Sequence, residues 1–494
     1  MKFVSIFLCI LLGFIKFSEA QGYSNLFMSG YDCCSPGSGG TNIDWISGTP
    51  IISYVPRNMN FSGASANITN ERGELLFYTN GDYIANSLND TMANGSGLCP
   101  GPFANSYRRM GFPIPQSVLI LPKDQGNSSL YYLIHEAGDV NVPLYSPTQL
   151  NYSIIDMSLN NGLGAVISKN NVLLNDTLSS GLITACRHAN GRDWWIVVPK
   201  TASNLYHIFL LTPFGIAHFS QQIGMVMDQL DWGQVVFSPE GEHYARMDSH
   251  NGLQILNFDR CSGTFSNFQH IDSAAFAGSP MFTGVAFSPN GRFLYVSHTL
   301  YVYQFDLLAS NLSNSKMLVA TYDGFVSGYS TTFYLAQLFN DGKIYIITGA
   351  GSDRLHVINY PDSLGLSCDV QQHSIVLSTY NAQTITTPPY FFSGAVDGSI
   401  CDSLILISSN NQLSQNQLEV APNPTHGVIT LHCKDCDITE IKIWNSLGGN
   451  CCKTIENNVT NQIEFTIDEF QPGVYILEVI LKSNKRVFKK IVLQ

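Results

Sequence analysis

The chain has 494 residues, of which 45% are hydrophobic and 13% are charged, and its formal net charge is −12. The hydrophobic share is ample for a packed core. The acidic balance makes the chain a poor ligand for a phosphate backbone, so we expect no nucleic-acid partner. Beyond the first twenty residues no apolar run approaches the length that crosses a bilayer, so we expect no transmembrane segment in the mature chain.

Residues 1–20 have the features of a secretory signal peptide. The segment begins with "MK", continues with the apolar stretch "FVSIFLCILLGFI" and ends with "SEA", which places small residues at Ser18 and Ala20. A membrane anchor is the alternative, but this apolar stretch is too short to span a bilayer. We therefore expect cleavage after Ala20 and export, which permits disulfides among the eleven cysteines that remain.

One phrase recurs along residues 21–408. It reads "VVFSPEGEHYARM" from Val235, "VAFSPNGRFLYVS" from Val285 and "QLFNDGKIYIITG" from Gln337. Each copy combines a short apolar strand, a glycine-containing turn and a second strand of alternating pattern. The turn glycines Gly191, Gly241, Gly291 and Gly342 lie 50, 50 and 51 residues apart, and weaker copies contain Gly73 and Gly126.

A strand meander that recurs about every 50 residues is typical of a β-propeller. An array of β-sandwiches would show a doubled period, and solenoid repeats are usually shorter. We predict an all-β fold with a propeller of six or seven blades, seven being favoured, and place the last, degenerate blade at "PPYFFSGAVDGSICDSLILIS". The aromatic pairs Trp194-Trp195 and Phe391-Phe392 are expected to pack between blades.

Residues 409–417, "SNNQLSQNQ", form a polar linker, and residues 418–494 form a compact module with seven short predicted strands, which indicates a small β-sandwich. Cys433 and Cys436 form a C-x-x-C near the adjacent pair Cys451-Cys452. Four cysteines can hold zinc, but two adjacent cysteines are a poor second pair for a tetrahedral site. Disulfides or free thiols are therefore favoured.

Two resemblances follow from these phrases. "NERGELLFYTNG" and "FSPNGRFLYVSHTLYVYQFDL" resemble a propeller ectodomain of secreted Bacteroidetes proteins, over residues 22–408, and this resemblance implies no activity. The C-terminal module resembles the type A sorting domain of cargo of the type IX secretion system. The residues that carry this second resemblance are Pro422, Asn423, Pro424, Gly427, Gly473, Tyr475, Lys489 and Lys490.

The second resemblance implies a route. The signal peptide would take the chain across the inner membrane, and the sorting domain would engage the type IX machinery at the outer membrane. We therefore expect a protein that is secreted or attached to the outer-membrane surface. The predicted domains are a signal peptide (1–20), a propeller (21–408), a linker (409–417) and a sorting domain (418–494).

The propeller carries no recognisable catalytic motif. H-x-H, H-E-x-x-H, G-x-S-x-G and P-loop patterns do not occur, so we predict no metal, cofactor or catalytic residues. We assign His135, Glu136 and Asp139 to a solvated loop. Four acids could project into a central funnel, but no spacing selects a pair of the kind that glycoside hydrolysis needs: Asp231, Asp248, Asp323 and Asp353.

Two functions remain open. The first is a binding, adhesion or scaffolding module for a glycan or a protein, since propeller loops present a broad recognition surface. The second is a secreted polysaccharide hydrolase or lyase with its site in the funnel. Two or more carboxylates converging at the funnel mouth would favour the enzyme, whereas a narrow apolar channel would favour binding through the outer loops.

Overall fold

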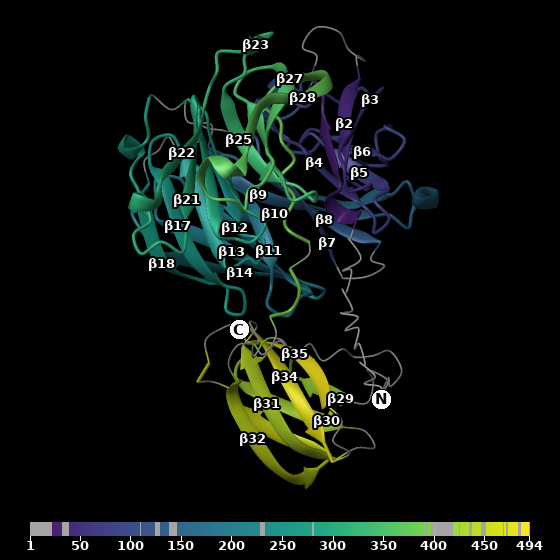
Figure 1. Cartoon of the computed structure of the whole chain (residues 1–494). Coiled ribbons are helices and arrows are strands. Elements are labelled where there is room, and N and C mark those ends of the chain that lie inside the picture. Colours follow the sequence, from purple (N-terminus) through teal and green to yellow (C-terminus); the bar gives the residue numbers. More distant parts are fainter. Residues whose placement is uncertain are drawn as a thin grey trace, which may run out of the picture.

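The structure is a computed structural model, shown in Figure 1. It describes residues 22–31, 39–108, 110–123, 129–137, 146–227, 233–278, 281–391, 393–396, 399, 401, 418–423, 425–433, 437–445, 451–467, 469–470, 473–482 and 486–493. The predicted signal peptide with Ala20 and the predicted linker 409–417 lie outside these residues. Within them, no helix is both long and apolar enough to cross a membrane.

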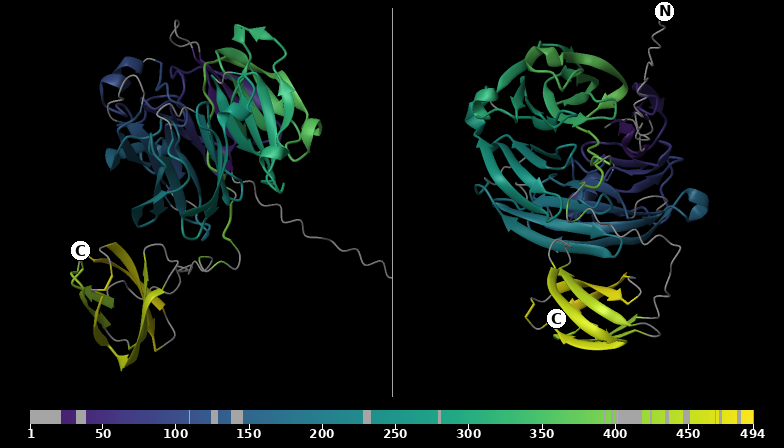
Figure 2. Two further views of the ribbon diagram at one scale, coloured as in Figure 1. Left: turned by 90° about the vertical axis from the view of Figure 1, so that its left-hand side faces the viewer. Right: turned by 60° about the horizontal axis from the view of Figure 1, so that its bottom comes forward.

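Seven antiparallel sheets form a ring, and each sheet is built from strands that follow one another along the chain (Figures 1 and 2). The first two blades have three strands each: β1 (Leu26–Ser29), β2 (Gly40–Asp44) and β3 (Ile51–Val55), then β4 (Ala66–Thr69), β5 (Leu75–Thr79) and β6 (Ile84–Asn86). The third and fourth blades have four strands each: β7 (Val118–Pro122), β8 (Leu130–Ala137), β9 (Gln149–Asp156) and β10 (Ala165–Asn175), then β11 (Thr184–Arg187), β12 (Trp194–Pro199), β13 (Leu205–Thr212) and β14 (Gly215–Gln222).

The last three blades repeat the four-stranded pattern. They contain β15 (Gly233–Phe237), β16 (His243–Asp248), β17 (Gly252–Asp259) and β18 (Thr264–Ile271); β19 (Thr283–Phe287), β20 (Phe293–His298), β21 (Tyr301–Asp306) and β22 (Met317–Thr321); and β25 (Phe333–Leu338), β26 (Ile344–Thr348), β27 (Ser352–Ile358) and β28 (Val370–Asn381). A small hairpin, β23 (Val326–Ser327) and β24 (Tyr329–Ser330), stands between the last two blades, and the short helix α1 (Pro102–Tyr107) precedes β7.

The repeated phrase forms the turn between the first two strands of a blade. In "SPNG" the amide of Ser288 donates to the carbonyl of Phe293, and Gly291 adopts a φ of 72°. Glycine takes this left-handed conformation at no steric cost, which explains the regular spacing of the turn glycines. The strands on either side are almost completely buried, because each blade packs on two neighbours.

Apolar clusters between blades hold the ring together. The ring closes where the first blade meets the last: Trp45 stacks on Phe339 with ring centroids 4.2 Å apart and meets the Tyr345 ring edge-on at 5.3 Å. The Trp45 indole also donates to the Tyr345 hydroxyl at 3.4 Å. No strand pairing joins these two sheets among the described residues. Side-chain packing closes the ring, together with a hydrogen bond of 3.0 Å from the Tyr31 amide to the Tyr380 carbonyl.

The prediction of a propeller, with seven blades favoured, is confirmed, but the position of the seventh blade was wrong. The six repeats found in the sequence each lie in a blade of their own. The seventh blade is the N-terminal one, β1–β3, and not the segment that begins at Pro388. The described part of that segment forms no strand, and residues 402–408 lie outside the described residues.

The C-terminal module is a sandwich of seven strands, as predicted. One sheet contains β29 (Leu418–Ala421), β30 (Val428–Cys433) and β33 (Gln462–Thr466), and the other contains β32 (Cys451–Thr460), β31 (Ile438–Asn445), β34 (Gly473–Leu481) and β35 (Arg486–Leu493). Their facing side chains form a separate core that includes Ile429, Leu431, Ile441, Leu477 and Ile491. Cys433 is disulfide-bonded, in agreement with the preference for disulfides over zinc.

Candidate functional site

The predicted sorting residues fall at three distant places in the sequence, and the sandwich brings two of them together. Gly473 opens β34 and pairs with Leu493 near the end of β35. Leu493 also forms a bridge with Thr425, inside the turn that joins β29 to β30. The turn at 422–427 and the start of the "GVYILEV" strand therefore meet at the C-terminal end of β35.

Hydrogen bonds within the sandwich stabilise the turn at 422–427. The Thr425 hydroxyl donates to the carbonyl of Val428 at 2.6 Å and accepts from the amide of Gly427 at 3.1 Å. The Gly427 carbonyl accepts from the amide of Ile467 at 2.7 Å. Pro422 and Asn423 are exposed next to it, whereas Pro424 lies outside the described residues.

The remaining sorting residues lie further along β34 and β35. Tyr475 pairs with Ile491 and stacks on Phe470 at a centroid distance of 5.2 Å. Lys489 pairs with Leu477, and Lys490 pairs with Ile476. Because side chains alternate along a strand, Lys489 shares the face of Ile491 and Leu493. The two lysines are thus set back from the end of β35 at which the other motif residues meet.

The second candidate site is the central channel, which the first strands of the blades enclose. Two buried glutamines bridge these strands. The Gln116 side chain exchanges hydrogen bonds of 2.9 and 3.1 Å with the backbone of Val235, two blades away. The Gln234 side chain in turn donates to Ala336 at 2.6 Å and accepts from Val285 at 3.0 Å. The channel is therefore spanned by side chains.

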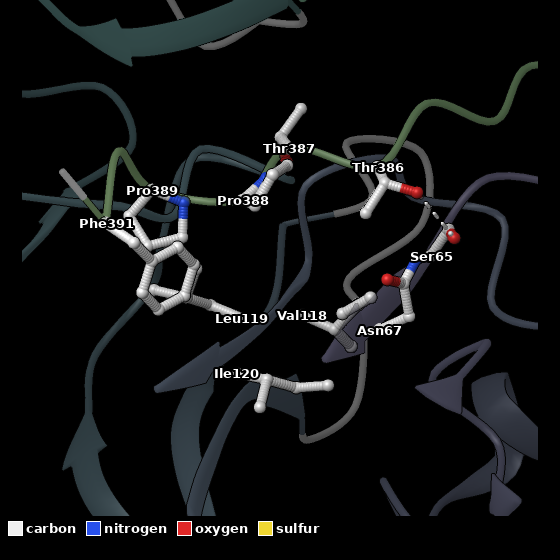
Figure 3. Close-up of a pocket in the computed structure, with 11 residues that line it drawn as sticks. Ser65, Asn67, Val118, Leu119, Ile120, Thr386, Thr387, Pro388, Pro389 and Phe391 are labelled. Carbon is white, nitrogen blue, oxygen red and sulfur yellow. Dashed lines mark hydrogen bonds between the residues drawn. The ribbon is translucent and has the colours of Figure 1, made fainter. Parts of the chain in front are cut away.

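A segment of the chain also occupies the channel. After β28, residues 382–391 cross the middle of the ring, as the green segment in Figure 2 shows. The Thr384 hydroxyl donates to Phe61 at 3.0 Å, and the Thr386 hydroxyl lies 3.3 Å from that of Ser65. Figure 3 shows Thr386–Phe391 over β4 and β7, and the space between them is about 10 Å³, barely enough to admit a single water molecule.

Arg260 and the neighbouring disulfide hold the chain that follows this channel segment. The Arg260 guanidinium donates to the carbonyl oxygens of Arg187 at 2.8 Å, Glu240 at 2.9 Å and Gly394 at 2.6 Å. The next residue, Cys261, forms a disulfide with Cys401. The segment is therefore tied to the fourth and fifth blades by both a buried arginine and a covalent bond.

Breaking this disulfide should weaken the fold. Cys401→Ser is expected to lower the free energy of unfolding by about 2–5 kcal/mol, since the bond closes a long loop. The two cysteines are 140 residues apart, and both are buried. Thermal unfolding with and without reductant measures the effect. The wild type should show a larger reductant-induced drop in Tm than the variant; equal drops would contradict the prediction.

An open cavity of about 330 Å³ lies beside the disulfide. Its acidic and basic lining residues are Glu242, His243, Asp259 and Arg260. The Asp259 carboxylate already accepts from the Cys261 amide and the Ser262 hydroxyl, both at 2.8 Å. With Asp259 and Arg260 engaged in the fold, the cavity offers no free pair of carboxylates among its described lining residues.

Of the four acids proposed for a funnel, the three that the structure describes do not converge in the channel. Asp248 is fully buried 3.6 Å from Arg246 within one blade. Asp323 pairs with His373 at 2.9 Å, and Asp353 pairs with Arg354 at 3.2 Å, both at the last blade. Asp231 lies outside the described residues. Among the described residues, no group of three or more His, Cys, Asp or Glu side chains is arranged to hold a metal ion.

His135 and Glu136 are not on a loop, so that prediction was wrong. Both lie in β8 and are fully buried, while Asp139 is outside the described residues. The Glu136 carboxylate accepts from the Gly181 amide at 2.9 Å, which stabilises its buried charge. His135 Nδ1 lies 3.3 Å from Cys99 Sγ, and Nε2 lies 3.3 Å from the Ser153 hydroxyl.

This Cys–His pair resembles a nucleophile with its base, but burial makes it inert. Burial raises the pKa of the Cys99 thiol far above its usual range and lowers the pKa of His135 to about 4. The pair is therefore a neutral thiol beside a neutral imidazole. A reactive cysteine needs a thiolate and access to solvent, and Cys99 has neither.

The pKa of His135 makes stability depend on pH. Between its usual value of 6.5 and about 4, the unfolded chain takes up a proton that the folded chain rejects. Stability is therefore complete above pH 6.5 and falls as pH drops through this window, by roughly 3 kcal/mol. Denaturant titrations at pH 7 and 4.5 should show a smaller loss for His135→Gln than for the wild type. Exposed His250→Gln should behave like the wild type, and an unchanged pH dependence of H135Q would contradict the assignment.

The fold and the two sites define a seven-bladed propeller followed by a separate sandwich. Residues 419–494 match the family model described as the secretion system C-terminal sorting domain. The sandwich is therefore a type IX sorting domain, and the chain is a cargo of that system, secreted or attached to the cell surface. The search of curated proteins found no match to the chain.

Solved structures resemble the chain only distantly. A candidate 6-phosphogluconolactonase from Bacteroides fragilis is 10% identical, with a TM-score of 0.45 over 74% of this chain and 96% of its own. A Lactobacillus plantarum protein is 11% identical, with a TM-score of 0.43 over 74% and 97%. The Cps50 (Swd1) β-propeller domain of Myceliophteria thermophila is 11% identical, with a TM-score of 0.37 over 67% and 91%. At such scores the assignment of blades rests on this chain's own strand pairing.

Proposed function

We propose that the exported propeller is a binding module that recognises a glycan or a protein through its outer surface and not through its channel. The observation that carries this proposal is the filled channel. Buried glutamines span it and residues 382–391 occupy it, so a polysaccharide has no route to its centre. The described lining of the channel pocket contains no carboxylate.

The experiment compares binding with turnover. The mature full-length protein is applied to a glycan array and incubated with the same glycans, and the release of reducing ends or unsaturated products is measured. We expect binding without product. Release that Asp323→Asn or Asp353→Asn abolishes, while the variant remains folded, would favour the hydrolase or lyase instead.

We also propose the domain boundaries and the sorting surface. The mature chain begins after Ala20, the propeller extends to residue 408, and residues 409–417 link it to the sorting domain. The surface that the type IX machinery reads includes the eight residues of the sorting motif. Mass spectrometry of the secreted protein tests the cleavage after Ala20, and a different N-terminus would contradict it.

A further inference from the structure

Two exposed tyrosines lie near each other at the last blade, one in the β23–β24 hairpin and one in β28. Tyr329 is 65% exposed at the tip of the β23–β24 hairpin, and Tyr380 is 49% exposed near the end of β28. Gly328, the neighbour of Tyr329 in the chain, lies against the Tyr380 ring, because a Cβ at this position would come within 2.8 Å of it. Figure 1 shows β23 at the outer end of this blade, beside β27 and β28.

These tyrosines differ from most others in the chain. Buried Tyr295 donates its hydroxyl to the carbonyl of Pro361, and buried Tyr345 donates to the carboxylate of Asp341, both at 2.7 Å. By contrast, no described residue makes a hydrogen bond or a ring contact with the side chain of Tyr329 or Tyr380. Both rings therefore offer a free face and a free hydroxyl to a ligand.

The hairpin that carries Tyr329 is firmly seated. Phe325 stacks on His373 at a centroid distance of 4.0 Å, and the Ser327 hydroxyl donates to the Asp353 carboxylate at 2.5 Å. The Thr331 hydroxyl closes the base of the hairpin by donating to the carbonyl of Phe325 at 3.0 Å. Binding would thus not have to order this loop, which removes a common entropic cost.

The charges around the rings are paired. Asp323 lies 2.9 Å from His373, and Asp353 lies 3.2 Å from Arg354. The surface therefore combines open aromatic faces with polar groups whose charges largely cancel. An anionic ligand would need unpaired cations, and a cationic ligand would need unpaired carboxylates. A sugar ring has the matching chemistry, with C–H groups on its faces and uncharged hydroxyls at its edges.

We propose that Tyr329 and Tyr380 form a platform for a neutral glycan, with a pyranose ring stacked on one or both tyrosines and its hydroxyls directed to Ser327 and the Asp353–Arg354 pair. This inference rests on the proposed binding function and assigns it a place and a ligand class. The platform is on the outer end of the blade, where a long polysaccharide can pass without entering the ring.

The test uses the mature full-length protein on an array of neutral hexose and N-acetylhexosamine oligosaccharides. Tyr329→Ala and Tyr380→Ala should each weaken binding by about tenfold or more, as expected for aromatic anchors. Tyr329→Phe, which keeps the ring, should retain most of the affinity. The matched control is Tyr360→Ala, because Tyr360 is 62% exposed but follows the opposite end of β27.

The outcomes separate this inference from the proposed function. Loss of neutral-glycan binding in both alanine variants but not in Tyr360→Ala supports the platform. Glycan binding that survives both substitutions overturns the platform and leaves the binding function intact. Binding only to charged glycans or to a protein does the same. Enzymatic turnover of a bound glycan overturns the proposed function itself.

Discussion

Deletion of residues 418–494 is expected to leave the propeller in the periplasm instead of at the cell surface. The signal peptide would still carry the truncated chain across the inner membrane, but the domain that matches the sorting family would be missing. Cell fractionation and protease accessibility of intact cells measure the change. Surface exposure of the truncated chain at the wild-type level would contradict the prediction.

A point variant makes this test sharper. Leu493 is buried where the turn at 422–427 meets the start of β34, so Leu493→Asp would place an unpaired charge at that junction. We expect export to fail, as we expect for the deletion. Glu464→Ala changes an exposed side chain of the same sandwich and should leave export unchanged. Normal export of L493D would show that the junction is not needed.

Removal of the Phe391 ring is expected to destabilise the propeller by about 3–5 kcal/mol. Phe391 is 3% exposed and ends the channel-filling segment. Its ring stacks on Tyr23 at 5.4 Å and meets Trp194 edge-on at 5.3 Å, so it connects the N-terminal turn, the exit segment and the fourth blade. Phe391→Ala would leave a cavity among these rings.

Denaturant titration of the full-length protein measures this loss. The control is Phe214→Ala, because the Phe214 ring is 75% exposed in the turn before β14 and its loss should change stability by no more than about 0.5 kcal/mol. Similar midpoints for both variants would show that the channel segment contributes little to the fold. Such a result would also weaken the argument that the channel is permanently closed.

Regular turn chemistry made most of the ring predictable. Five blades have a described left-handed glycine between their first two strands, and such a glycine leaves a visible mark in sequence. The sixth copy of the phrase, around Gly126, marked a further blade from its sequence alone. The N-terminal blade was missed because residues 30–39, between β1 and β2, do not carry the repeated phrase. Blade count was therefore predictable, but the position of the seventh blade was not.

The channel segment was misread because its apolar residues are buried outside any sheet. Pattern alone does not distinguish a strand from an extended segment that packs in a channel. Pro388 and Pro389 were the available signal, since proline lacks the amide that a central strand donates. The burial of Glu136 was not predictable either, because its partner, the amide of Gly181, is 45 residues away.

The candidate sites were predictable to different degrees. The sorting residues could be found because a short turn and a terminal strand carry them as local patterns. The tyrosine platform could not be found, since Tyr329 and Tyr380 are distant in sequence and only the fold places the hairpin at Gly328 against Tyr380. Pairing of Asp323 with His373 likewise joins residues 50 positions apart.

The disulfide at Cys401 has a consequence for maturation. All described bonds that secure the channel segment involve residues up to Cys401, upstream of the sorting domain. A protease that cleaves the chain after Cys401 would remove the sorting domain and leave the Cys261–Cys401 disulfide intact. The propeller can thus lose its sorting domain after export and still keep its fold and its occupied channel.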